Sequence, residues 1–542
     1  MSSTTGAGGE KRIFLRKASG LIRTAGPFDT FIFNIGLVSV GLGIGTMMYY
    51  GPAFYPGGNL VAACIISGVV MSMIAFGMIC WSVTLPRSGG IYVFGSRSLA
   101  PWLALTLSLV EITTWLFYCA IAAYWIIILG VSPTLAMIGY VTGFEWAQNG
   151  ANLVTQPWPK FLIGSGILVL SGLIIASGMR FYLLTQKIVF ALAMLGSVLL
   201  IVVLLSGSHE QFVANFNTLM APIIGVDDPY NAIITSAAAN GWTTEGADWI
   251  TTIKLSNWSF LPLLGAAFSI SIAGEIKSVE KAQTYGMLGA IVITVVIWLI
   301  TIPLANSVFG YDFLGSAVYN FWVPGEGVLT TPTDASITLM AGILTNSWLV
   351  TLLCSLGLIL WMWMWIPGMH TFGVRAMVAW AFDRIAPSAL GTISPTRHTP
   401  TVAIWVGVVI TVIFMALFVF TSYFATVVIM IEAALLAWSI VLLAGVFFPY
   451  TRPHIYDKSP IAGKKVFGLP MMTVGCALGF LGSQFYFWAL FFDEVAAGHK
   501  PDQLALVFGI FLIGIIFFFV MKAYRKTQGI DVNLAFKEIP IE

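Results

Sequence analysis

The sequence predicts an all-α integral membrane protein with about twelve transmembrane helices. Of its 542 residues, 58% are hydrophobic and only 9% are charged. A soluble domain usually has about 25% charged residues, so this surface needs lipid rather than water around it. Apolar runs recur along the whole chain, and the basic residues between them fall mainly in every second loop. These observations define the fold class.

An apolar run of roughly 20 residues crosses a bilayer core of about 30 Å as a helix. The runs that qualify are 31–52, 59–84, 101–129, 159–179, 183–206, 257–276, 285–308, 338–366, 401–420, 422–448, 470–491 and 503–522. With the N-terminus in the cytoplasm, 22 of the 25 Lys and Arg residues lie on the cytoplasmic side. The positive-inside rule therefore predicts an even number of spans and two cytoplasmic termini. No cleavable signal peptide is predicted, because no small-residue cleavage site follows the first run.

Helix-breaking residues occur inside the first and sixth spans. The first span contains Gly41, Leu42, Gly43, Ile44, Gly45 and Thr46. The sixth contains Leu261, Pro262, Leu264 and Gly265. Glycine weakens a helix, and proline removes a backbone N–H. Lipid tolerates a broken helix only beside protein or a water-filled cavity. Because these spans open two possible five-helix halves, the paired breaks predict a binding site near the bilayer midplane.

The chemistry expected at these breaks suits a zwitterion. A half-helix beginning near Gly45 would present free N–H groups to a carboxylate. Freed carbonyls near Leu42 and Leu264 would suit an ammonium group or a cation. An α-amino acid satisfies both requirements. The alternative is that the glycines only let neighbouring helices pack closely.

Several motifs resemble those of the amino acid–polyamine–organocation (APC) permeases. Residues 85–92 (LPRSGGIY) are similar to that family's P-x-S-G-G-x-Y segment. Residues 375–387 (RAMVAWAFDRIAP) resemble its R-x-x-y-a-m-A-r-D-g-x-x-P stretch, and they keep register at Arg375, Ala381, Asp383 and Pro387. Residues 399–400 (TP) and 274–277 (GEIK) match weaker elements. The resemblance covers most of the chain.

The resemblance implies a 5+5 inverted repeat with two further C-terminal helices, and a substrate held between the broken first and sixth helices. Gly43, Ile44 and Gly45 then take the place of the family's G-S-G, and Gly265 that of its sixth-helix glycine. Ile44 removes a hydroxyl from that pattern. Some members carry a lysine in span five that stands in for a sodium ion, and Ala193 occupies that position here.

The chain accordingly divides into six segments. They are a cytoplasmic tail (1–30), a first five-helix repeat (31–206), an extracellular loop (207–256), a second repeat (257–448), a cytoplasmic loop with helices eleven and twelve (449–523) and a cytoplasmic C-terminal tail (524–542). The polar stretches 207–256 and 309–337 are each a lid or a simple connector.

Three acidic residues are candidates for ion coupling or gating. Glu111 lies in span three and Glu432 in span ten, where burial in lipid penalises the charged form. Each is a candidate to carry a proton or to bind a substrate amine; the alternative is a protonated side chain bonded to a neighbouring helix. Glu275 lies at the inner end of span six, and we expect it beside Lys277. Lys187 is expected to extend its amine towards the interface.

Weaker candidates lie beside the breaks. Phe268, together with Phe260, flanks the sixth-helix break and is a candidate gate. Asn34 and Ser39 precede the first break, and Ser269 and Ser271 follow the second. Serine within a span more often bonds its own helix than a ligand.

The remaining composition argues against other classes of protein. The five cysteines lie in apolar runs, the five histidines do not cluster, and no HExxH, GxSxG or P-loop motif occurs. No metal, cofactor or nucleic-acid partner is expected. An enzyme would need a catalytic constellation at depth, and a channel or sensor would need a filter ring or a signalling domain. The leading hypothesis is a secondary transporter of amino acids, coupled to H+ or Na+ or working by exchange, as a monomer or homodimer. The alternative is a permease for polyamines or other organic cations.

Overall fold

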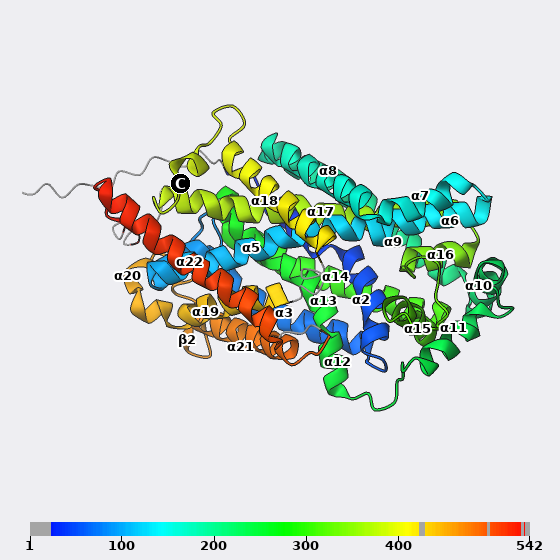
Figure 1. Ribbon diagram of the computed structural model, residues 1–542. Helices are drawn as coiled ribbons and strands as arrows, with labels where there is room; N and C mark the ends of the chain where they lie inside the picture. The colour runs from blue at the N-terminus through cyan, green and yellow to red at the C-terminus, as the bar shows by residue number, and fades with distance from the viewer. Residues whose placement is uncertain (1–22, 422–428, 496–498, 533–535, 537–542) are drawn as a thin grey trace, which may run out of the picture.

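The computed structural model describes all residues except 1–22, 422–428, 496–498, 533–535 and 537–542. The predicted N-terminal tail up to residue 22 and the first part of predicted span ten lie outside these residues. Within the described part, twelve helices are long and apolar enough to cross a membrane, which confirms the predicted number. They run along the long axis of the molecule (Figure 1).

Several of the twelve spans consist of more than one helical element. They are α1 with α2 (Pro27–Val38, Val40–Phe54), α3 (Leu60–Thr84), α5 with η1 and α6 (Pro101–Trp125, Ile126–Val131, Ser132–Thr142), α8 (Pro157–Ala176), α9 (Met179–Ser206), α12 with α13 and η2 (Trp249–Leu255, Asn257–Leu263, Leu264–Glu275), α14 (Val279–Phe309), α17 (Trp348–Phe382), α18 (Thr401–Phe420), α19 (Ile429–Thr451), α21 (Met471–Phe491) and α22 (Pro501–Thr527).

The connecting segments hold shorter elements. They are α4 (Ile91–Ser98), α7 (Glu145–Thr155), α10 (His209–Ile224), α11 (Pro229–Ala239), α15 (Tyr311–Trp322), α16 (Ile337–Thr345), η3 (Ser388–Gly391), α20 (Pro453–Tyr456), β1 (Lys465–Val466) and β2 (Leu469–Pro470). Helices α10, α11, α15 and α16 gather at one end of the molecule (Figure 1). We call this end the outer side, and the opposite end, which the positive-inside rule places in the cytoplasm, the inner side.

Two predicted boundaries are wrong. Span eight was predicted over 338–366, but α16 ends at Thr345, the chain turns through Asn346 with φ 48°, and the spanning helix is α17. The apolar run used for the prediction includes two separate helices, α16 and the first part of α17. The predicted span also ended too early, because α17 continues through Pro367. The stretch 207–256 is largely helical, and α12 makes the sixth span begin at Trp249 rather than at residue 257.

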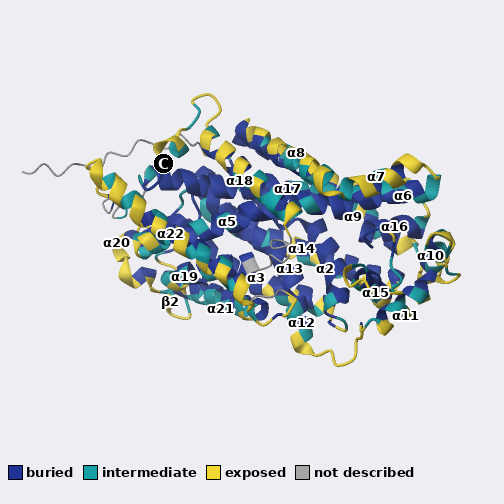
Figure 2. Cartoon of the chain, in the orientation of Figure 1, coloured by how far each residue is buried: buried dark blue, intermediate teal, exposed yellow. Residues whose placement is uncertain are grey.

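The first and sixth spans form the centre of the bundle. In their most apolar windows 94% and 100% of the residues are buried, against 22% in the last span, which faces lipid on most sides. Figure 2 shows this contrast between the dark interior and the exposed outer helices. Within the centre, α1 packs against η2, α14 and α17. Any site between the two central spans is therefore enclosed by protein on all sides.

Candidate functional site

The first span is interrupted at Ser39. This residue has φ 53° and ψ 72°, a left-handed conformation that is uncommon for a residue with a side chain, and it separates α1 from α2. Its hydroxyl is buried and has no hydrogen-bond partner among the described residues. The second half-helix therefore begins at Val40, five residues earlier than the predicted start near Gly45.

The glycine run is helical and does not form the break. A Cβ on Gly43 would lie 2.0 Å from Cζ2 of Trp298, and one on Gly41 would lie 2.6 Å from Cδ1 of Trp361. These glycines thus admit two indole rings, which is the close-packing alternative. The Leu42 carbonyl, predicted to be free, accepts a hydrogen bond of 2.9 Å from the Thr46 hydroxyl.

The sixth span changes its winding where the sequence predicts. Helix α13 contains Leu261 and Pro262 and ends at Leu263, and the chain continues from Leu264 as the 3-10 helix η2. Ile272 then has φ −111° and ψ 16°, which is outside the helical region. The change is a tighter coil followed by a kink, and not an extended gap.

The two interrupted spans touch backbone to backbone. A Cβ on Gly265 would lie 2.0 Å from the carbonyl oxygen of Leu37 and 2.7 Å from the amide nitrogen of Val38. Only glycine allows this approach, because neither neighbour is a movable side chain. Gly265 thus brings the start of η2 against the residues immediately before Ser39.

A polar network on the inner side of this contact ties three helices together. The side-chain nitrogen Nδ2 of Asn34 donates to the Ser269 hydroxyl (3.0 Å), and the backbone N–H of Ser269 donates to the side-chain oxygen of Asn34 (3.1 Å). Gln283 on α14 donates to the Ser269 carbonyl at 3.1 Å and accepts from its hydroxyl. Sequence reasoning named Asn34 and Ser269 but missed Gln283, since no local signal marks a partner on the next helix.

Aromatic side chains fill the space beside the break. The Phe268 ring lies 4.6 Å from Trp115, 4.9 Å from Phe372 and 6.2 Å from Trp438, measured between ring centroids. Trp115 and Trp438 were not predicted as site residues. Phe260, expected to flank the break with Phe268, instead stacks on Tyr486 of α21 at 3.6 Å.

The two carboxyl groups predicted at membrane depth, those of Glu111 and Glu432, are both buried. Glu111 is 0% exposed; its Oε1 accepts a hydrogen bond of 2.6 Å from Nε1 of Trp438, and its Oε2 has no partner among the described residues. Glu432 is 4% exposed, and its Oε1 likewise has no partner there. Glu111 therefore adjoins the aromatic cluster through Trp438.

Glu275 pairs with Arg375 and not with Lys277. Nε of Arg375 lies 2.6 Å from Oε1 of Glu275 and its Nη2 lies 3.1 Å from Oε2, and both side chains are almost fully buried. The expected partner, Lys277, is exposed. Because Arg375 is on α17, this bidentate pair joins the inner end of the sixth span to the eighth.

Two further contacts close the inner side. Nη1 of Arg97 lies 2.8 Å from Asp383, which also accepts a hydrogen bond of 2.8 Å from the Tyr92 hydroxyl. In addition, the N–H groups of Thr24 and Ala25 donate to the Glu275 carbonyl at 2.9 and 3.1 Å. The chain before α1 is thereby fixed to the end of η2.

The outer side is closed mainly by aromatic residues. Tyr50 stacks on Trp258 with centroids 4.2 Å apart, and Nε1 of Trp322 donates to the Tyr49 hydroxyl at 3.0 Å. That hydroxyl donates in turn to the carboxylate of Asp334. Trp322 and Asp334 come from the stretch 309–337, which therefore contacts the outer half of the first span.

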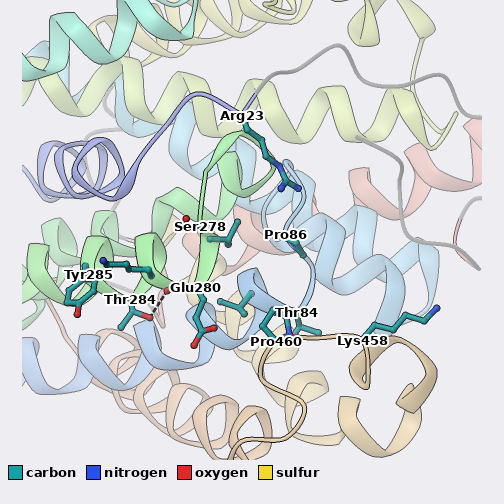
Figure 3. A pocket seen from close by; sticks show the side chains of 12 residues that line it. Arg23, Thr84, Pro86, Ser278, Glu280, Thr284, Tyr285, Lys458 and Pro460 are labelled. Atoms are coloured by element: carbon teal, nitrogen blue, oxygen red, sulfur yellow. Dashed lines mark hydrogen bonds between the residues drawn. The ribbon is translucent and has the colours of Figure 1, made fainter.

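A cavity of about 20 Å³ lies beside α2, lined among others by Gly41, Ile44, Ser197 and Trp361. This volume holds about one water molecule and no amino acid. A cavity of about 770 Å³ lies on the inner side between α3, α14 and the segment before α21 (Figure 3). The conformation is thus closed around the interrupted helices.

No metal cluster appears in the described part of the chain. Its residues contain no group of three or more His, Cys, Asp or Glu placed to hold an ion. The five cysteines are buried and free.

Comparisons with known proteins agree with this architecture. A family model described as "Amino acid permease" matches residues 26–518. The branched-chain amino acid permease BcaP of Lactococcus lactis subsp. cremoris is 25% identical over 275 residues, which cover 50% of this chain and 50% of that protein. The match thus spans about half the length of the curated relative.

Proposed function

Because the chain belongs to the amino acid permease family, a family of membrane transporters and not of enzymes, we propose that it moves amino acids across the cell membrane by alternating access around the interruption at Ser39. The single observation that carries this proposal is the contact between Gly265 and the backbone before Ser39. It brings the two interrupted spans together at the centre of the bundle. Rocking of these spans against the rest would expose this point to either side in turn.

The substrate's charged groups would be bound by backbone. The first N–H groups of α2, from Val40 to Leu42, have no helical acceptor of their own, because the N–H of Gly43 is the first to bond back, to Ser39, at 3.1 Å. A helix N-terminus favours a carboxylate. The unpartnered Ser39 hydroxyl lies at the same point of the chain. We therefore propose that the substrate's carboxylate binds nearer to Ser39 than to Gly45, and that Gly43 mainly leaves space for Trp298. The residues predicted from the sequence to bind the substrate were Gly41 to Thr46, Leu261, Leu264, Gly265 and Phe268.

The aromatic cluster would set the side-chain preference. Phe268, Trp115 and Trp438 offer a large apolar surface beside the break. Such a surface favours neutral, bulky apolar amino acids, in line with the branched-chain specificity in the name of the Lactococcus relative. We propose leucine, isoleucine, valine and phenylalanine as the first substrates to test.

Glu111 is our candidate for proton coupling. It is fully buried, holds one hydrogen bond from Trp438, and keeps one oxygen without a partner among the described residues. A buried carboxyl at membrane depth is costly when charged and is usually neutralised or functional. Trp438 contacts both Glu111 and Phe268. A change in the protonation of Glu111 would therefore alter the aromatic side chains beside the proposed substrate site.

The alternative is transport of a polyamine or another organic cation. It is favoured by the free oxygens of Glu111 and Glu432, since both could meet amines. Uptake into proteoliposomes of labelled leucine, phenylalanine, arginine and putrescine separates the two. Saturable uptake of neutral amino acids that putrescine does not compete with supports the first proposal, and the reverse pattern overturns it.

The coupling test uses the same vesicles with imposed proton or sodium gradients. We expect a proton gradient to drive uptake in the wild type. Glu111→Gln should abolish this drive while amino acid exchange continues. Glu145→Gln, a change at an exposed position on α7, is the matched control and should behave like the wild type. Uptake driven by sodium alone would contradict the assignment of Glu111.

A further inference from the structure

A second inner cavity, of about 210 Å³, lies between the start of α1, the start of α9 and the segment after η2. Four cationic side chains line it: Arg23, Arg180, Lys187 and Lys277. Among the described residues that line it, Asp29 is the only acidic one. The cations come from three segments that are distant in the sequence. The positive-inside rule predicts basic residues on this side of the membrane but does not predict that they converge.

The charges of this cavity do not balance. Oδ1 of Asp29 lies 2.5 Å from Nζ of Lys187, and its Oδ2 accepts the N–H of Gly26 at 2.8 Å. No ion pair within the described residues involves Arg23, Arg180 or Lys277. The Thr24 hydroxyl, which also lines the cavity, is buried without a hydrogen-bond partner there. The cavity thus offers cations and a hydroxyl to an anion.

The backbone holds these cations in place. The Lys277 N–H donates to the Ala25 carbonyl at 2.8 Å, and residues 25 and 276 form a parallel bridge. Arg23 and Lys277 therefore lie within two residues of this isolated bridge between the two segments. Arg180 and Lys187 are seven residues apart on α9, so they share one face of that helix.

The two helices that border the cavity carry exposed apolar side chains. Phe28 is 61% exposed, Phe181 50%, Leu184 55% and Ile188 55%, and all four belong to the helices α1 and α9 that border the cavity. Leu184 itself lines it. A ligand with an anionic head and an acyl tail would meet cations at one end and apolar surface at the other.

We propose that this cavity binds the phosphate group of an anionic phospholipid from the inner leaflet. The bound headgroup would bridge α1, α9 and the end of the sixth span, and so stabilise the closed inner side. Binding itself is independent of transport, whereas the effect of the lipid on the transport cycle rests on the proposed function.

The test measures lipid binding by the full-length purified protein. A short-chain phosphatidylglycerol, the matching phosphatidylcholine and inorganic phosphate are each titrated, with the thermal shift as the readout. We expect phosphatidylglycerol to stabilise the protein and the other two to have little effect. The double variant Arg180→Gln/Lys277→Gln should bind phosphatidylglycerol about 30-fold more weakly, since each of the two basic residues near an anionic surface contributes a factor of about five.

The matched control removes two cations from the other inner cavity, drawn in Figure 3. Lys281→Gln/Lys458→Gln changes the net charge equally and should bind phosphatidylglycerol like the wild type. Equal weakening in both double variants would show non-specific attraction and overturn the proposal. Inorganic phosphate that binds as tightly as the lipid and competes with it would overturn the lipid assignment. Restored binding in Arg180→Lys/Lys277→Arg would support it.

A transport measurement then separates this proposal from the proposed function. If phosphatidylglycerol binding is specific but no amino acid is taken up, the proposed function fails and the lipid site stands. If uptake proceeds at the same rate in vesicles with and without phosphatidylglycerol, the stabilising role of the lipid fails while the proposed function stands.

Discussion

The two ends of the central helices are closed by different chemistry. On the inner side, buried charges pair across helices: Glu275 with Arg375, and Arg97 with Asp383. On the outer side, aromatic rings stack, and the carboxylates of Asp334 and Asp493 accept the hydroxyls of Tyr49 and Tyr55. Both closures join one of the interrupted spans, or a segment beside it, to the surrounding helices.

This difference indicates how each side could open. A buried ion pair resists loss of one partner, because the charge left behind has no water to replace it. Stacked rings can slide apart without leaving an unpaired charge. We therefore expect the inner closure to be the more sensitive to substitution and the outer closure to be the more sensitive to pH.

The largest effect is expected from breaking the inner pair. Glu275→Gln leaves Arg375 buried without its counter-charge, and Nη1 of that arginine already has no partner among the described residues. The free energy of unfolding should fall by about 3–5 kcal/mol. Thermal unfolding of the purified protein, together with uptake, measures the loss. A loss no larger than that of the exposed change Glu280→Gln would contradict the assignment of the inner closure.

A smaller effect is expected from the outer hydroxyl. Tyr49→Phe keeps the ring but leaves Asp334 without this donor and Nε1 of Trp322 without this acceptor. An unsatisfied buried polar group costs about 1–3 kcal/mol. Hydrogen–deuterium exchange should then be faster in residues 323–336 and unchanged on the inner side. Tyr285→Phe, at an exposed tyrosine, serves as the control.

The outer closure should also depend on pH. Burial, the largest cause, raises the pKa of Asp334 from 3.8 to about 6, while the Tyr49 hydroxyl and Lys160 oppose that rise. The outer closure with Asp334 buried therefore holds a proton more tightly than an open form in which this carboxyl has its ordinary pKa. Closing becomes more favourable as the pH falls through about 6, by up to about tenfold per pH unit down to about 4.

Asp334→Asn should remove this dependence. Exchange of residues 323–336, corrected for the intrinsic pH dependence of amide exchange, is compared between pH values of about 7 and 5 in the wild type and the variant. Asp312→Asn, an exposed change on α15, should keep the wild-type profile. Faster corrected exchange of residues 323–336 at the lower pH would show that the proton binds the open form instead.

The sequence was sufficient for the spans and for the general place of the site. Apolar length and the distribution of basic residues depend only on local composition, so the twelve helices could be counted. Pro262 marked the change of winding in the sixth span for the same reason, since proline disrupts a helix wherever it stands. Gly265 was predicted as a substrate-binding residue at the break, and its contact with the backbone of Leu37 was not predicted.

The predictions that were wrong concern residues whose structure depends on contacts with residues distant in the sequence. Gly41 and Gly43 lie in a helix and leave space for the rings of Trp361 and Trp298. The sequence near the two glycines does not indicate that these distant rings pack there. Ser39 carries the break, yet a serine in an apolar run gives no sign of a left-handed conformation. Arg375, the partner of Glu275, lies 100 residues away, so the nearby Lys277 was the natural but wrong choice.

The smallest expected effect shows whether burial or charge gives the inner closure its strength. Lys464 and Glu280 also pair on the inner side, but their side chains are 48% and 44% exposed. Lys464→Gln should change the free energy of unfolding by less than about 1 kcal/mol, because water screens an exposed pair. Raising the salt concentration from about 0.05 to about 0.5 M should erase even this difference, while the loss in Glu275→Gln should persist. Thermal unfolding of both variants at the two concentrations provides the test; equal sensitivity to salt would mean that solvent reaches Glu275 and Arg375, and that the inner closure is no stronger than the outer one.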